Sequence, residues 1–103
     1  DARSEERFKG KVEEPRKLVT KGTIPNSINI PFHKIFDYDG FLLKDKKLKD
    51  LFKVKKKIFE KNIIVLCGSG ITACNIIFAL EILDKRFNYL YDGSWSEWGY
   101  IEI

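Results

Sequence analysis

The residues best suited to chemistry are Cys67-Gly68-Ser69-Gly70, which directly follow the apolar run 63–66. A continuous β-branched and apolar run predicts a parallel strand buried on both faces, and the apolar segment 71–83 predicts a buried helix. A cysteine between a strand end and a helix N-terminus lies where backbone amides and the helix dipole stabilise an anion. Such surroundings lower the pKa of a thiol from its free value of about 8.5. The pattern therefore predicts that Cys67 is a nucleophile held as a thiolate.

The neighbours of Cys67 fit this interpretation. Gly68 and Gly70 allow a tight turn whose amides point inward, and the hydroxyls of Ser69 and Thr72 are further donors to the same anion. A histidine base is not required, and His33, the only histidine, has no evident acidic partner in the sequence. The sequence thus disfavours an acyl-transfer enzyme of the Cys-His type.

A loop of this composition could also be structural, bind phosphate or belong to a phosphatase. A cysteine at a strand end is often simply a packed core residue. Phosphate-binding loops of the Walker or dinucleotide type need glycine spacings that are absent here. A cysteine phosphatase needs an arginine after five intervening residues, where this chain has Ala73. The nucleophile remains the favoured hypothesis.

The second cysteine, Cys74, lies inside the segment predicted as a buried helix, so we expect it to be a core residue. A disulfide from Cys67 to Cys74 would join a strand end to a point within that helix, which is poor geometry. Two cysteines and one histidine are too few for a structural zinc site. Both thiols are expected to be free and no metal is predicted.

An anionic substrate calls for cations, and arginine binds carboxylates and similar groups in a forked, planar way. Arg7 and Arg16 lie in or beside the N-terminal loop region, which in a sheet of this type can return near the site. Ordinary surface charge is the alternative interpretation of both.

The elements that must position these residues alternate between strand and helix. The 103 residues and 12.0 kDa allow one domain. The predicted class is α/β, with a central, mainly parallel sheet and helices on both faces. The expected elements are a short helix after Ser4, a polar loop over 11–23, a strand at 28–30, a helical turn at 33–37, a helix at 46–60 capped by Asp45, strands at 63–66 and 89–91, a helix at 71–83, and a helical turn holding Trp95 and Trp98. Exposure of either tryptophan would indicate contact with another domain.

Charge is concentrated in one segment. The net charge is +4, and residues 44–61 hold nine lysines against three acidic residues. Leucines and phenylalanines recur there at helical spacing, so the lysines are expected to form a solvated helix face rather than a nucleic-acid or membrane site. No apolar run approaches the roughly 20 residues that span a bilayer. The sequence predicts neither a nucleic-acid nor a membrane partner.

Several motifs in order along the chain resemble the rhodanese-type sulfurtransferases. The matching stretches are Asp1-Ala2-Arg3 with Arg7-Phe8, Glu14-Pro15-Arg16, the segment from Gly22 to Phe32, the loop from Cys67 to Cys74, and Tyr91-Asp92-Gly93-Ser94-Trp95 with Glu97-Trp98. The match resembles most the C-terminal catalytic domain of two-domain thiosulfate or 3-mercaptopyruvate sulfurtransferases. The resemblance implies that residues 1–103 belong to a longer protein, with the first strand cut at Asp1 and a preceding rhodanese-like domain.

The resemblance also implies roles for individual residues. Cys67 would carry a persulfide, Arg7 and Arg16 would hold the anionic group of a small sulfur donor, and Ser69 would assist at its carbonyl end. Gly68, Gly70, Ile71 and Thr72 complete the active-site loop. No cofactor is implied. The acceptor would be cyanide or a thiol such as that of a thioredoxin-like protein, and the compartment would be the cytoplasm or the mitochondrion.

The donor is inferred from the loop. Thiosulfate-preferring members of the family tend to carry basic residues after the cysteine, whereas Gly68 and Ser69 are uncharged. We therefore expect 3-mercaptopyruvate, a monoanion, to be the donor. The alternatives are thiosulfate and a non-catalytic rhodanese-like binding module.

Overall fold

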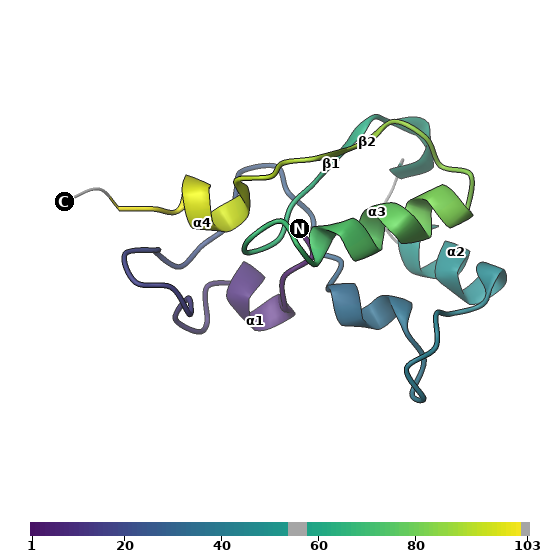
Figure 1. The fold of residues 1–103 in the computed structure, drawn as a ribbon, viewed down its shortest axis with the longest axis horizontal. Helices are drawn as coiled ribbons and strands as arrows, with labels where there is room; N and C mark the ends of the chain where they lie inside the picture. The colour runs from purple at the N-terminus through teal and green to yellow at the C-terminus, as the bar shows by residue number, and fades with distance from the viewer. Residues whose placement is uncertain (54–57, 102–103) are drawn as a thin grey trace.

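A computed structural model describes residues 1–53 and 58–101 of the chain. The helix α3 runs through the middle of the molecule, with the strands above it, α2 at one end and α4 at the other (Figure 1). In chain order the elements are α1 (Glu5–Phe8), the 3-10 turn η1 (Phe32–Ile35), α2 (Asp45–Lys53), the 3-10 turn η2 (Ile58–Glu60), β1 (Ile63–Val65), α3 (Ala73–Ile82), β2 (Asn88–Leu90) and α4 (Ser94–Trp98).

The sheet consists of β1 and β2, which pair in parallel from Ile63 opposite Asn88 to Val65 opposite Leu90. Because parallel neighbours need a crossover, α3 connects them, as expected of a β-α-β unit. The predicted α/β class with a parallel sheet is confirmed. The loop that carries Cys67 begins directly after the carboxyl end of β1.

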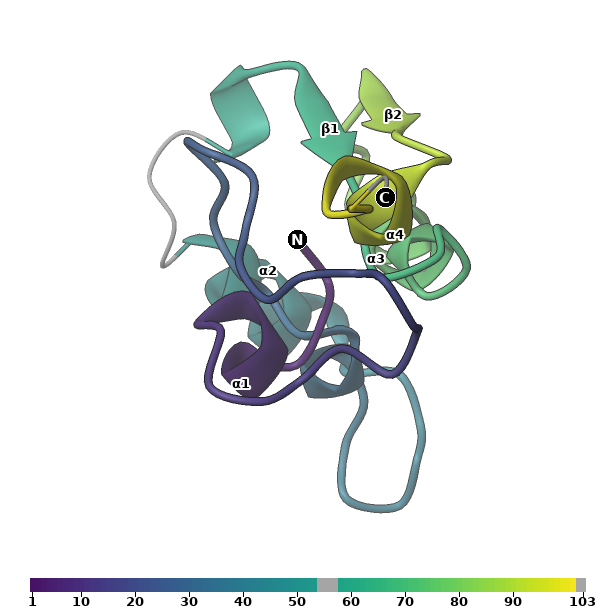
Figure 2. The same ribbon diagram turned by 90° about the vertical axis from the view of Figure 1, so that its left-hand side faces the viewer.

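The N-terminus lies centrally rather than at the periphery (Figure 2). The Ala2 amide donates to the Leu66 carbonyl at 2.8 Å, and the Ile30 amide donates to the Asp1 carbonyl at 3.0 Å. The predicted strand at 28–30 is wrong, since this segment is not a strand. Its backbone partner consists of residues 1–2 only, which is too short to form a regular ladder.

The core lies between the helices and the sheet. Most of its buried members come from α2, β1, α3 and η1. They include Ile35, Leu48, Phe52, Val65 and Leu80. The inward orientation that the apolar spacing of the lysine-rich segment predicts is confirmed at Leu48 and Phe52, which are both buried.

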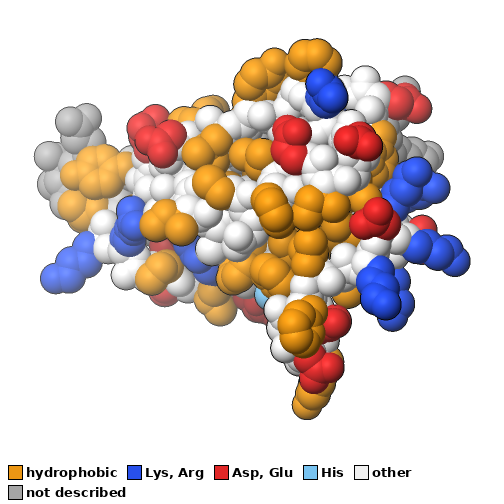
Figure 3. Space-filling model, turned by 45° about the vertical axis from the view of Figure 1, so that its right-hand side comes forward, with side chains coloured by type: hydrophobic (Ala, Val, Ile, Leu, Met, Phe, Trp, Pro, Cys, Tyr) orange, Lys and Arg blue, Asp and Glu red, His pale blue; other side chains and the backbone are white. Residues whose placement is uncertain are grey.

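The prediction that β1 and α3 are buried on all sides is wrong. Ile64 of β1 is 67% exposed and Phe78 of α3 is 60% exposed. Cys74, predicted as a core residue, is also exposed. A single apolar sequence cannot reveal which face another layer covers, and the described part of the chain covers only one face of each element. Hydrophobic side chains gather in the middle of the face shown in Figure 3.

The helix predicted at 46–60 is shorter than expected. α2 begins at Asp45, which is its first residue rather than its cap, and ends at Lys53. Residues 54–57 of that prediction lie outside the described residues, and 58–60 form the separate turn η2. This turn directs Ile58 into the core and leaves Phe59 only half-buried, whereas a continuous helix would place Phe59 in line with Phe52.

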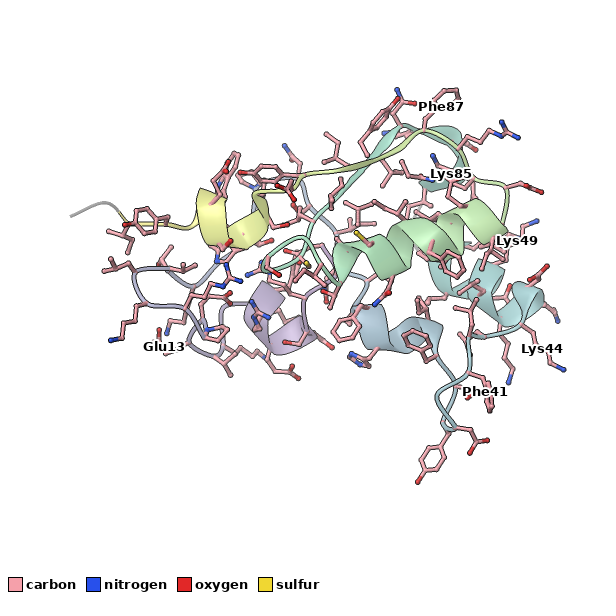
Figure 4. All side chains as sticks on the ribbon, viewed as in Figure 1. Glu13, Phe41, Lys44, Lys49, Lys85 and Phe87 are labelled. Carbon is pink, nitrogen blue, oxygen red and sulfur yellow. The ribbon has the colours of Figure 1, made fainter. Side chains whose placement is uncertain are left out.

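The lysines of α2 are exposed, as a solvated face requires. Lys44 and Lys49 project from the end of the molecule farthest from α4 (Figure 4). Within the described ranges, no helix has the length and apolar character needed to cross a membrane.

Candidate active site

Cys67 occupies the loop between β1 and α3, residues 66–72, which we call the Cys67 loop. The cysteine is buried, with an exposed fraction of 1%. The Gly70 amide donates to the sulfur at 2.9 Å. Thr72 precedes α3 but its side chain makes no capping hydrogen bond, so its hydroxyl is available to the sulfur.

Two opposing effects set the charge state of Cys67. Burial alone raises the pKa of the thiol, whereas hydrogen bonds from the Thr72 hydroxyl and from the amides of Ala73, Ser69 and Gly70 lower it. The hydrogen bonds prevail, and the pKa of Cys67 lies below its ordinary value. Hydrogen-bond donors around a buried sulfur favour its thiolate form, which is the nucleophilic form of a cysteine.

Both glycines of the loop stand where a side chain would collide. Gly70 has φ +94°, and a Cβ there would lie 2.8 Å from the Asp92 carbonyl oxygen. A Cβ on Gly68 would lie 2.5 Å from Nη2 of Arg7. The loop therefore packs against the segment before α4 on one side and against an arginine on the other.

The segment around α4 fixes the Cys67 loop by its backbone. The Cys67 amide donates to Oγ of Ser94 at 3.2 Å, and that hydroxyl donates to the Tyr91 carbonyl at 2.9 Å. In return, the amides of Trp95 and Ser96 donate to the carbonyls of Cys67 and Gly68, each at 2.9 Å. Sequence reasoning assigned no role to Ser94, although it lies in a quoted motif, because the contact joins residues 27 apart.

A cavity of about 250 Å³ adjoins the sulfur. It brings together the predicted residues Cys67, Gly68, Ser69, Thr72, Arg7 and Arg16. Two predicted loop residues do not line this cavity: Ile71, whose side chain is exposed, and Gly70, which contacts the sulfur through its amide. We call this hollow the Cys67 cavity.

The two predicted arginines differ in their surroundings. Arg7 is partly buried and makes two hydrogen bonds to the carboxylate of Glu14, at 2.7 and 3.1 Å. Arg16 is exposed at the cavity wall, and the described residues give its side chain no ion pair. Glu14 was not singled out from the sequence, because charges seven residues apart in a loop carry no periodic signal.

A third arginine, Arg3, connects two segments that contact the Cys67 loop. Arg3 is buried, pairs with the Asp1 carboxylate at 2.7 Å, and lies 4.8 Å from the ring centroid of Trp95. The indole of Trp95 in turn donates to the Thr20 carbonyl at 2.8 Å. Arg3 thus links the N-terminus to α4, and both contact the Cys67 loop.

His33 and Cys74 lie apart from the reactive sulfur. His33 is in η1 against Phe32 and does not line the Cys67 cavity. Cys67 and Cys74 are both free thiols. Among the residues that the structure describes, no group of three or more potential metal ligands comes together.

The thiolate assignment predicts a pH effect. Thr72→Val removes the hydroxyl donor at almost constant volume, so the pKa of Cys67 is expected to rise. The rate of alkylation by iodoacetamide, measured against pH in a Cys74→Ser background, should then reach its midpoint at higher pH than in the parent. The control is Thr20→Val, which changes an exposed threonine and should leave the midpoint in place. An unchanged midpoint in Thr72→Val would show that the hydroxyl does not stabilise the thiolate.

Comparison with known proteins gives consistent matches. The sequence model of a family described as the rhodanese-like domain matches residues 1–100. The chain is 41% identical to the 3-mercaptopyruvate sulfurtransferase of Mus musculus, over 95% of this chain and 33% of that protein. It is 44% identical to the mitochondrial thiosulfate/3-mercaptopyruvate sulfurtransferase 1 of Arabidopsis thaliana, over 95% of this chain and 26% of that protein.

A solved structure shares the same arrangement. The crystal structure of the Tum1 protein from Saccharomyces cerevisiae superposes with a TM-score of 0.84 at 32% identity. The match covers 95% of this chain and 35% of that one. The chain therefore spans about a third of the length of the relatives it matches.

Proposed function

This chain belongs to the rhodanese-like domain family, and on that premise we propose that it catalyses sulfur transfer. Cys67 takes a sulfur atom from 3-mercaptopyruvate and passes it to a thiol or to cyanide. The observation that carries the proposal is the convergence of the Gly70 amide and the Thr72 hydroxyl on a buried sulfur beside a cavity lined by Arg7 and Arg16.

The first half-reaction is a displacement at sulfur. The Cys67 thiolate attacks the donor's sulfur, an S–S bond forms, and the C–S bond breaks with its electron pair leaving on pyruvate enolate. The enolate takes up a proton from water to give pyruvate. Arg7 and Arg16 hold the donor's carboxylate, and Ser69 donates to the carbonyl oxygen on which the enolate charge develops.

The second half-reaction restores the enzyme. A thiolate acceptor, such as that of a thioredoxin-like protein, attacks the outer sulfur of the Cys67 persulfide. A new S–S bond forms, the old one breaks, and Cys67 leaves as the thiolate. The same hydrogen bonds that lower the pKa of Cys67 make it a good leaving group in this step.

The donor assignment rests on charge. Thiosulfate is a dianion, whereas the loop residues after Cys67 are neutral and Arg7 is already paired with Glu14. This favours a monoanionic carboxylate. A non-catalytic module is disfavoured because Cys67 and all its donors are in place.

The proposal is tested by comparing two rates in the full-length protein. We expect pyruvate release from 3-mercaptopyruvate to exceed thiocyanate formation from thiosulfate by roughly tenfold or more in kcat/KM, as a charge mismatch in a partly buried site predicts. Equal or faster turnover of thiosulfate would contradict the assignment of 3-mercaptopyruvate as the donor. The absence of both activities would favour the binding module.

We also propose that another part of the full-length protein covers a second, largely apolar hollow. It has a volume of about 540 Å³ and is lined by residues that include Ile28, Ile64 and Trp98. Trp98 is 55% exposed, and apolar surface of this kind marks a contact. The covering surface would come from a preceding rhodanese-like domain and the strand that joins it to this chain. We expect the backbone amides of residues 24–30 to exchange hydrogen more slowly in the full-length protein than in residues 1–103 alone. Equal exchange rates would contradict the proposal that this hollow is covered.

A further inference from the structure

The carboxylate of Glu14 is an unusual component of a cavity meant for anions. Its side chain is 3% exposed and lies against the guanidinium of Arg7. Oε2 accepts from Nε of Arg7 at 3.1 Å, and Oε1 accepts from Nη2 at 2.7 Å. A two-bond fork of this kind fixes both the position and the plane of a guanidinium. Arg3 adds a weaker contact to Oε2 at 3.5 Å.

The two hydrogen bonds from Glu14 hold the Arg7 side chain against Gly68 of the Cys67 loop. The Arg7 side chain stands so close to Gly68 that a Cβ there would lie 2.5 Å from Nη2. The Gly68 carbonyl is held by the Ser96 amide at 2.9 Å, so the loop cannot move away from the guanidinium. Glu14 thus restrains one wall of the cavity relative to the nucleophile.

The fork also changes the charge that a donor meets. The ionisable side chains lining the Cys67 cavity, apart from the cysteine, are Arg3, Arg7, Arg16 and Glu14. The Asp1 carboxylate balances Arg3, and Glu14 balances Arg7. Arg16 is left as the cation without an opposing carboxylate within the described residues. One uncompensated positive charge suits a monoanion better than a dianion.

We propose that Glu14 is a positioning residue that sets donor specificity: it holds Arg7 against Gly68 and cancels one positive charge of the Cys67 cavity. The cavity thereby selects a donor with a single carboxylate over a dianion such as thiosulfate. This inference rests on the proposed sulfurtransferase function. A buried ion pair that serves folding alone is the competing hypothesis, and the two differ in their kinetic consequences.

The test is Glu14→Gln in the full-length protein, assayed with both donors at a fixed ionic strength. Glutamine keeps an acceptor oxygen for Arg7 but removes the charge. We expect KM for thiosulfate to fall more than KM for 3-mercaptopyruvate, kcat at saturation to change less than about threefold for both donors, and the preference for 3-mercaptopyruvate over thiosulfate in kcat/KM to fall roughly tenfold. A lower melting temperature with an unchanged donor preference would show a purely structural role and overturn the proposal.

The matched control is Glu13→Gln, which removes the same charge one residue away. The Glu13 side chain is 82% exposed, pairs with Lys21 at 3.3 Å, and projects from the surface of the molecule (Figure 4). Its substitution should leave the donor preference unchanged. An equal change in both variants would show that the overall charge, rather than the contact with Arg7, is responsible, and would also overturn the proposal.

A second variant, Glu14→Asp, distinguishes the effect of the position of Arg7 from the effect of the Glu14 charge. It also tests the proposal if Glu14→Gln does not fold. Glu14→Asp keeps the charge but shortens the side chain, so the fork to Arg7 is lost. We expect a higher KM for both donors with little change in their ratio. Unchanged KM values for both would contradict a positioning role. Absence of turnover with either donor in the parent protein would instead refute the proposed function itself.

Discussion

Replacing Cys67 with serine is expected to abolish sulfur transfer from both 3-mercaptopyruvate and thiosulfate, a loss of at least about 10³-fold in kcat. Serine has nearly the same shape, and the Gly70 amide that donates to the sulfur at 2.9 Å can donate to a hydroxyl oxygen instead. A hydroxyl does not ionise in this pH range, and oxygen cannot carry the transferred sulfur as a persulfide. Initial rates of pyruvate and thiocyanate formation measure the effect.

The control for this variant is Cys74→Ser. Cys74 is exposed on the first turn of α3, with its sulfur 3.5 Å from the Gly70 carbonyl oxygen, and it does not line the Cys67 cavity. It should retain activity within about twofold. Retained activity in Cys67→Ser, or its loss in Cys74→Ser, would assign the reaction to a different residue.

Gly70→Ala is expected to lower kcat/KM by roughly 100-fold, because a displacement of about 1 Å at a reacting centre has an effect of that size. Gly70 has φ +94°, and an added Cβ would lie 2.8 Å from the Asp92 carbonyl oxygen. The loop must shift to relieve that contact, and the Gly70 amide would move away from the sulfur it stabilises. The free energy of unfolding should also fall, by about 2 kcal/mol or more.

Gly40→Ala is the control that distinguishes backbone strain at a positive φ from the collision with a neighbouring carbonyl in Gly70→Ala. Gly40 has a similar φ of +87°, but a Cβ there would meet nothing within 4 Å. This variant should lose about 1 kcal/mol of stability from backbone strain alone and keep full activity. If Gly70→Ala were as active as Gly40→Ala, the close approach of the Cys67 loop to Asp92 would have no part in catalysis.

Local patterns predicted the elements around Cys67 well. The apolar run before the cysteine became β1, the apolar segment after it became α3, and Ser4 accepts the Arg7 amide at the start of α1 as a capping serine should. These features depend on residues close together in the sequence. Strand and helix periodicity and cap preferences report such features directly.

Burial was predicted less well because it depends on what covers each face. The sequences of β1 and α3 are apolar on all sides, yet Ile64 and Phe78 face outward. Nothing in either run of residues distinguishes the face that packs on the core from the face that does not. The error at Cys74 has the same cause.

The structure brings together, around the Cys67 cavity, residues that the sequence singled out by chemical type, whereas residues that act through long-range contacts were not singled out. Cys67 and the two arginines stood out by type and position. Ser94 and Glu14 act through contacts between loops that have no repeating spacing. Both lie in motifs that carry the family resemblance, which was the available signal for them.

The most direct test of the central claim, that Cys67 carries the sulfur, is the mass of the peptide that contains Cys67. The full-length protein is treated with 3-mercaptopyruvate in the absence of any acceptor thiol and digested under conditions that preserve persulfides. We predict that Cys67 gains the mass of one sulfur atom, in an amount equal to the pyruvate released, and loses it when a thiol is added. Release of pyruvate with Cys67 unmodified, or with the added sulfur on Cys74, would contradict that claim.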